Sequence, residues 1–147
     1  MEIQTKYHGS LSVEQENLLT FPQGIPGFQD EKEFTLLPFP GNDWFHILQS
    51  TATPELGFVA TEPFSFFPDY EFELDEASIE TLRHPEGKDL KILSILTIRE
   101  PLDRSTANLQ APVIINPAQQ LGKQVILTGT DYQTQHPIFN QTERKRG

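Results

Sequence analysis

Proline and glycine interrupt this chain so often that long regular elements have little room. Twelve prolines and nine glycines are spread over 147 residues. The apolar segments between them are short and rich in β-branched and aromatic residues, which is typical of short strands joined by turns. We expect strands over residues 3–7, 18–21, 34–39, 44–49, 56–60, 70–74, 90–98, 112–115 and 124–128.

The length of the chain favours a single domain. At 16.7 kDa, one core buries roughly 70% of the surface that the unfolded chain exposes, and eleven Phe supply bulk for that core. We expect a mostly β, compact single-domain, β-barrel-like fold of short antiparallel strands with one or two short helices. Residues 1–141 would form this domain, and residues 142–147 a short, frayed polar tail.

Residues 70–74 alternate between apolar and acidic side chains. This period of two predicts a strand with Tyr70, Phe72 and Leu74 towards the core, and with Glu71 and Glu73 in solvent. The strand would therefore have an acidic outer face.

The next segment has the pattern of a helix. Asp75 is placed to cap its N-terminus, Glu76 favours the positive end of the helix dipole, and Ile79 and Leu82 share one face. Residues 84–85, His-Pro, are expected to end this helix.

Other patterns predict a core strand and two connections. Residues 92–98 are almost continuously apolar, as in a central strand covered on both faces. Gly24 and Gly27 flank a proline in a turn that needs positive φ. A second connection is expected between Asn116-Pro117 and Gly122-Lys123.

The net charge of −10 is concentrated in one third of the chain. Residues 33–82 contain ten acidic side chains and no Lys or Arg, whereas the remainder carries eleven of each sign. This sign disfavours direct binding to a phosphate backbone. A segregated field can steer a basic partner or repel a competitor of like charge, although a surplus of acid also simply maintains solubility.

Several kinds of chemistry lack support in the sequence. There is no Cys, which fits a reducing cytoplasm, and the first residues have neither the basic nor the apolar region of a signal peptide. No apolar run is long enough to span a membrane. Nucleophile-elbow, phosphate-loop and dinucleotide motifs are missing, and the four histidines lack metal-ligand spacing. We therefore expect no catalytic residue, no metal and no cofactor.

Aromatic residues beside the acidic segment are candidate anchors for a protein partner. Three Phe occur within residues 64–67, between two prolines, so at least one is expected to be exposed next to the acids. Trp44 falls inside a strand-like segment and is expected in the core. An alternative use of Glu71 and Glu73, as an acid–base pair acting on glycans, conflicts with their predicted exposure.

The order of several short motifs resembles the FliW family of flagellar assembly factors over nearly the whole chain. The segments that carry the resemblance are residues 21–28 (FPQGIPGF), 34–39 (FTLLPF), 48–50 (LQS), 54–58 (PELGF), 68–74 (PDYEFEL), 106–116 (TANLQAPVIIN) and 124–127 (QVIL).

The resemblance implies a non-enzymatic protein of the bacterial cytoplasm. Members of this family bind CsrA, a basic RNA-binding dimer that represses translation of flagellin mRNA, and they also bind flagellin. The implied function is to couple flagellin synthesis to flagellum assembly, with the protein monomeric on its own. A dedicated acidic chaperone of flagellin with no CsrA role and, less favoured, a carbohydrate-active protein remain alternatives.

Combining the resemblance with the charge pattern yields candidate contact residues. We expect the partner-facing field to centre on Asp69, Glu71 and Glu73, with Phe66 or Phe67 as apolar anchors. The acidic residues that complete the candidate set are Glu62, Asp75 and Glu76.

Overall fold

The structure is a computed structural model, and it describes residues 1–83 and 89–139. Short strands dominate it. They are β1 (Glu2–Thr5), β2 (Gly9–Ser12), β3 (Leu18–Thr20), β4 (Glu33–Phe39), β5 (Asn42–Ser50), β6 (Gly57–Thr61), β7 (Lys91–Thr97), β8 (Thr106–Ala107), β9 (Val113–Asn116), β10 (Leu121–Gln124) and β11 (His136–Pro137). The helical elements are α1 (Glu76–Thr81) and the 3₁₀ turns η1 (Gln15–Asn17), η2 (Pro63–Ser65), η4 (Leu102–Arg104) and η5 (Pro117–Gln119).

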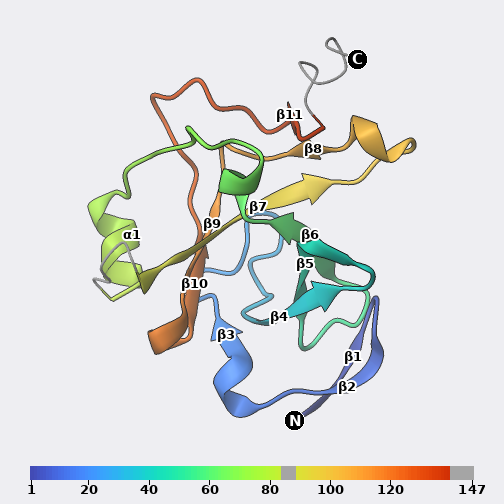
Figure 1. The fold of residues 1–147 in the computed structure, drawn as a ribbon. Helices are drawn as coiled ribbons and strands as arrows, with labels where there is room; N and C mark the ends of the chain where they lie inside the picture. Colours follow the sequence, from blue (N-terminus) through green and yellow to red (C-terminus); the bar gives the residue numbers. More distant parts are fainter. Residues whose placement is uncertain (84–88, 140–147) are drawn as a thin grey trace.

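Seven of these strands follow one another around a ring. The order is β7-β6-β5-β4-β3-β10-β9, and β9 pairs back onto β7 (Figure 1). All these pairings are antiparallel except β3 with β10, which are parallel and share the single register pair Thr20 and Leu121. β8 and β11 extend the sheet beyond β7, and β1 and β2 form a separate hairpin. The mostly β, barrel-like expectation is confirmed.

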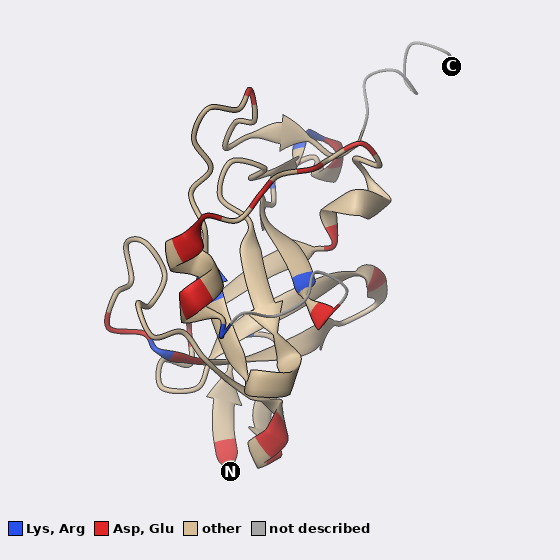
Figure 2. Cartoon of the chain, turned by 90° about the vertical axis from the view of Figure 1, so that its left-hand side faces the viewer, with Lys and Arg blue, Asp and Glu red and all other residues tan. Residues whose placement is uncertain are grey.

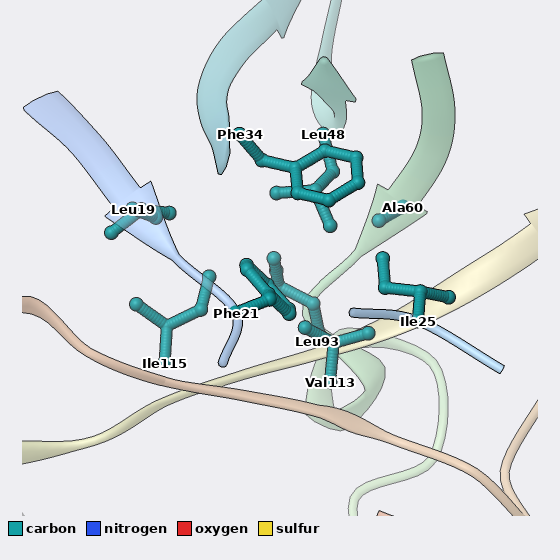
Figure 3. Packing of buried hydrophobic residues seen from close by; sticks show 9 residues of the cluster. All are labelled: Leu19, Phe21, Ile25, Phe34, Leu48, Ala60, Leu93, Val113 and Ile115. Carbon is teal, nitrogen blue, oxygen red and sulfur yellow. The ribbon is translucent and has the colours of Figure 1, made fainter. Parts of the chain in front are cut away.

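The main core lies inside the ring. Figure 3 shows side chains from strands around the ring pointing towards one another, with the rings of Phe21 and Phe34 5.1 Å apart in an edge-to-face arrangement. Burial of each large apolar side chain contributes about 1.5–3 kcal/mol. The cluster comprises Leu19, Phe21, Ile25, Phe34, Leu48, Ala60, Leu93, Val113 and Ile115.

The core strand, the capped helix start and the glycine turn are confirmed. β7 pairs with β6, β8 and β9, as a central strand does. The Asp75 carboxylate accepts a hydrogen bond from the Ser78 N–H at 2.9 Å, which caps α1. Gly24 and Gly27 adopt φ of 66° and 88°. The expected helix end at residues 84–85 and the expected tail at 142–147 lie outside the described residues.

The helical content agrees with the expectation of one or two short helices. Within residues 1–83 and 89–139, α1 is the only α-helix, and no helix is long and apolar enough to cross a membrane.

The predicted strand over residues 70–74 is wrong, although its burial pattern is right. Tyr70 is buried, Phe72 and Leu74 are half-buried, and Glu71 and Glu73 are exposed. The segment nevertheless belongs to no β-ladder of the described chain, because no strand runs alongside it at hydrogen-bonding distance. Alternation follows from which side faces the core, whereas a strand also needs a neighbour.

The predicted boundaries of the last hairpin are also wrong. β10 covers residues 121–124 instead of 124–128, so Gly122 and Lys123 lie within a strand and not in a connection. The chain reverses through η5 and Gln120, which adopts a left-handed φ of 55°. This tight turn brings Leu121 opposite Asn116 and moves the hairpin start towards the N-terminus.

Trp44 is not in the core, contrary to prediction. Its side chain is 60% exposed, whereas that of Phe45 is buried. Successive residues of β5 point to opposite faces, so only one of these two aromatics can face inwards. The N-terminal hairpin also contains a strand, β2, that the sequence did not predict.

The close approach of β10 to the core leads to a stability prediction. A methyl group at Gly122 would lie only 2.6 Å from Cε1 of Phe21. We expect Gly122→Ala to lower the free energy of unfolding by about 1–3 kcal/mol through overpacking. Urea denaturation measures this change.

A double-mutant cycle supplies the control. Phe21→Leu removes part of the ring that the new methyl group meets, so the two substitutions together should cost less than the sum of the single costs. A Gly122→Ala variant as stable as the parent protein would contradict the packing argument.

Candidate functional site

Five acidic side chains gather along one side of the molecule. They lie on the segment between η2 and the first turn of α1, which Figure 2 shows as a red-marked trace running into the red-marked helix. All five are exposed. We call this set, which consists of Asp69, Glu71, Glu73, Asp75 and Glu76, the acidic edge.

The acidic edge is held by aromatic side chains instead of a sheet. The hydroxyl of Tyr70 donates a 2.7 Å hydrogen bond to the carbonyl of Leu109, and the rings of Tyr70 and Tyr132 are 4.7 Å apart. The Glu71 N–H donates to the Tyr132 hydroxyl at 3.1 Å. Burial, with a smaller effect of Tyr132, raises the pKa of Tyr70 above its ordinary value, so the hydroxyl keeps its proton, and with it the hydrogen bond to Leu109, into more alkaline solution than an exposed tyrosine would.

Asp75 has a structural role in the acidic edge. The hydroxyl and the backbone N–H of Ser78 both face its carboxylate and hold its pKa below the ordinary value; only the N–H contact, at 2.9 Å, has hydrogen-bond geometry. Glu76 follows in the first turn of α1, where a negative charge is favoured by the helix dipole. These two acids therefore need no functional explanation, unlike Asp69, Glu71 and Glu73.

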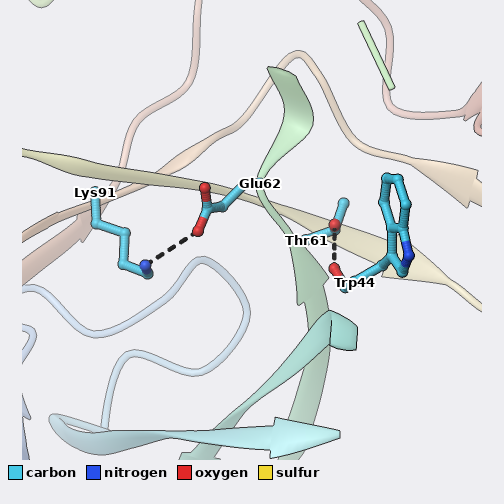
Figure 4. A network of polar contacts seen from close by, with 4 residues as sticks. All are labelled: Trp44, Thr61, Glu62 and Lys91. Carbon is cyan, nitrogen blue, oxygen red and sulfur yellow. Dashed lines mark hydrogen bonds and ion pairs between the residues drawn. The ribbon is translucent and has the colours of Figure 1, made fainter. Parts of the chain in front are cut away.

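Glu62 lies apart from the acidic edge, immediately after β6. Its carboxylate forms an ion pair at 3.1 Å with Nζ of Lys91, the first residue of β7 (Figure 4). Both side chains are partly exposed. Lys91 therefore offsets part of the negative charge of Glu62, which we expected to contact a partner.

The aromatic candidates are only partly accessible. Phe66 and Phe67 are half-buried and pack against a second cluster that includes Tyr70. Phe64 is 42% exposed, which confirms that at least one residue of this group faces solvent. The most exposed ring of the group is therefore that of Phe64, and not that of either predicted anchor.

Trp44 is an exposed aromatic residue that the sequence prediction missed. Its ring lies 5.5 Å from that of Phe66, and the Thr61 hydroxyl donates a 2.6 Å hydrogen bond to its carbonyl (Figure 4). The alternation along β5 was the signal that could have located it. Trp44 also lines a surface hollow of about 320 Å³ with Asp43, His46, Glu62 and Ser65.

Two further hollows flank the acidic edge, each of about 310 Å³. The first lies between the acidic edge and the segment after β10, and is lined by Phe72, Glu73, Asp75, Val125, Ile126, Leu127, Thr128 and Thr130. The second is lined by Phe64, Tyr70, Glu71, Phe72, Leu74, Leu90, Ile92 and Ile114.

The site offers surfaces for binding and little support for catalysis. Glu71 and Glu73 are exposed, so they lack the apolar environment that tunes a carboxylic acid for glycoside cleavage. Across the described ranges, no group of three His, Cys, Asp or Glu side chains is placed to hold a metal ion.

Comparisons with known proteins point to one protein family over nearly the whole chain. The sequence model of the FliW protein family matches residues 2–138. A flagellar assembly factor FliW of Geobacillus sp. (strain WCH70) is 52% identical over 139 residues, covering 95% of this chain and 96% of the relative. The corresponding factor of Bacillus subtilis (strain 168) is 44% identical over 138 residues, covering 94% and 96%.

A solved structure is also similar. The crystal structure of a flagellar assembly factor FliW superposes with a TM-score of 0.91 at 49% sequence identity, covering 96% of this chain and 99% of that one.

The cap at Asp75 leads to a pH-dependent prediction. Because the folded pKa is lowered, the ionised carboxylate stabilises the fold above its unfolded pKa of about 3.9, and this stabilisation is lost as the pH falls through the folded value. Asp75→Ala should therefore be less stable than the parent protein at pH 7, with a smaller difference at pH 3. Urea denaturation at both pH values measures this.

Asp75→Asn is the matched control, since its amide oxygen can still accept the Ser78 hydrogen bond without titrating. A destabilisation by Asp75→Ala that is equal at both pH values would refute the electrostatic part of the argument.

Proposed function

Because this chain belongs to the FliW family of flagellar assembly factors, we propose that it binds the translational repressor CsrA and prevents repression of flagellin mRNA. We further propose that it binds flagellin, so that free flagellin controls how much of the protein remains for CsrA. In this proposal the protein acts in the cytoplasm, as a monomer on its own, through protein binding and without catalysis.

The observation that carries the CsrA proposal is the exposed acidic edge. The acidic edge lies within residues 33–82, and this part of the chain contains no Lys or Arg. CsrA is a basic partner in this proposal, so opposite charges would steer the encounter. The sign of the field also argues against direct contact of this protein with RNA.

The same field would act on RNA that is already near CsrA. A carboxylate influences a phosphate within about 8–10 Å at physiological ionic strength. Asp69, Glu71 and Glu73 project from the surface instead of forming ion pairs among the described residues. Held beside an RNA channel, they would oppose phosphate entry by repulsion without occupying the channel.

The support for flagellin binding is exposed apolar surface instead of charge. Apolar surface is available at Trp44 and Phe64, both of which are exposed. Exposed aromatic rings are favourable centres for protein contacts, because they bury a large area with few rotatable bonds. This supports a protein partner at the aromatic side, close to the acidic edge.

Charge reversal tests the role of the acidic edge. We expect Glu71→Lys combined with Glu73→Lys to weaken CsrA binding roughly tenfold at low salt and to reduce RNA displacement, because two attractive charges become repulsive. Calorimetric titration measures the affinity, and a competition assay with flagellin-leader RNA measures displacement.

The matched control reverses two exposed acids with the same spacing at the start of η1, Glu14→Lys at its N-cap with Glu16→Lys within it. It changes the net charge equally, so its affinity should stay near that of the parent protein. If the Glu71 and Glu73 reversal leaves both binding and RNA displacement unchanged, the acidic edge is not the CsrA surface.

Salt dependence separates a steering field from a packed interface. Titration with CsrA at about 0.05 M and 0.5 M salt should give weaker binding at the higher concentration, where the Debye length falls to a few ångströms. Absence of binding at both salts, with flagellin still bound, would favour a dedicated flagellin chaperone and overturn the CsrA proposal.

A further inference from the structure

Two neighbouring segments have the side-chain pattern of strands but lack a strand partner at one edge or at both. In residues 71–74, exposed acids alternate with half-buried Phe72 and Leu74. In residues 125–128, buried Val125 and Leu127 alternate with Ile126, whose side chain is 59% exposed.

The second of these segments is hydrogen-bonded on one side only. The N–H groups of Val125 and Leu127 donate to the carbonyls of Pro112 and Gln110 at 2.9 and 2.8 Å, continuing the direction of the β9–β10 hairpin. The N–H groups of Ile126 and Thr128 donate to no acceptor within residues 1–83 and 89–139. One edge is therefore paired, and the other is open.

The first segment has no paired main-chain edge over residues 72–74 in the described structure. The N–H groups of Phe72, Glu73 and Leu74 have no acceptor in the described part of the chain. Exposed backbone groups in an alternating segment can template the addition of another strand.

The open edges border the first hollow of about 310 Å³, which both segments line. This volume is at the small end of the range for ligand pockets. It suits an inserted side chain better than a larger molecule. Figure 1 shows the two segments approaching each other above α1 and β10.

We propose that this hollow is a strand-addition site, which binds an extended segment of a protein partner in which Lys or Arg alternates with aliphatic residues. Main-chain hydrogen bonds to residues 71–74 or 126–128 would supply affinity, and an aliphatic side chain would enter the hollow. Glu71 and Glu73 select a basic segment by charge complementarity. The inference rests on the proposed function only for the sign of the partner's charge.

A synthetic peptide, acetyl-Lys-Val-Lys-Val-Lys-Val-amide, tests the site without CsrA or flagellin. Hydrogen exchange followed by NMR should show slower exchange of at least one amide in residues 72–74, or at Ile126 or Thr128, with saturable dependence on peptide concentration. The same peptide with N-methylated valines keeps its charge but loses main-chain donors. It should bind at least about tenfold more weakly and leave these amides unprotected.

A variant pair then locates the site. Ile126→Lys places a positive charge at the rim of the hollow and should abolish the protection, whereas Ile98→Lys, at another exposed isoleucine, should not. Both positions are exposed, so the fold should tolerate both changes.

Three outcomes would overturn the inference. The first is that the peptide protects none of these amides. The second is that the N-methylated peptide binds equally well. The third is protection that appears without peptide as the protein concentration rises, which would make a second copy the occupant. Failure of CsrA binding with intact peptide protection would overturn the proposed function alone, and CsrA binding without amide protection would overturn the strand-addition site alone.

Discussion

Closure of the strand ring through β7 is the constraint on which the rest of the structure depends. β7 pairs with β6 on one edge and with β9 and β8 on the other, so it joins both ends of the ring. On the far side, β3 and β10 are joined by one register pair, where Gly122 leaves room for the ring of Phe21. The ring surrounds the main apolar cluster, while β8 and β11 extend the sheet beyond β7 and β1 and β2 form a separate hairpin.

The ring sets the position of the candidate site, and aromatic contacts hold the site in place. The acidic edge itself belongs to none of the β-ladders of the described structure. Tyr70 instead fixes the segment through its hydrogen bond to Leu109 and its packing against Tyr132. The main chain beside Glu73 is therefore left without a ladder partner in the described structure. The exposed carboxylates and the unpaired main-chain groups therefore lie on the same segment, because side-chain contacts and not a β-ladder hold that segment in place.

Much of the fold was predictable because it depends on local rules. The apolar run of residues 92–98 predicted a central strand, and Asp75 predicted a helix start; both are present. Trp44 and the segment 70–74 were mispredicted because the face of β5 and the absence of a neighbouring strand depend on residues far away in the sequence. For the site, the acidic charges and their outward direction were predictable, whereas the ion pair of Glu62 with Lys91 was not.

The sequence by itself determined the mostly β character with short strands, the location of the negative charge and the family, since these follow from composition, periodicity and motif order. Only the tertiary structure decided which strands pair, which aromatic side chains reach solvent and which main-chain edges stay open. The physical reason is that hydrogen-bond partners and burial are set by contacts between segments distant in the chain. Periodicity records which side of a segment is apolar, but it carries no information about what lies beside it.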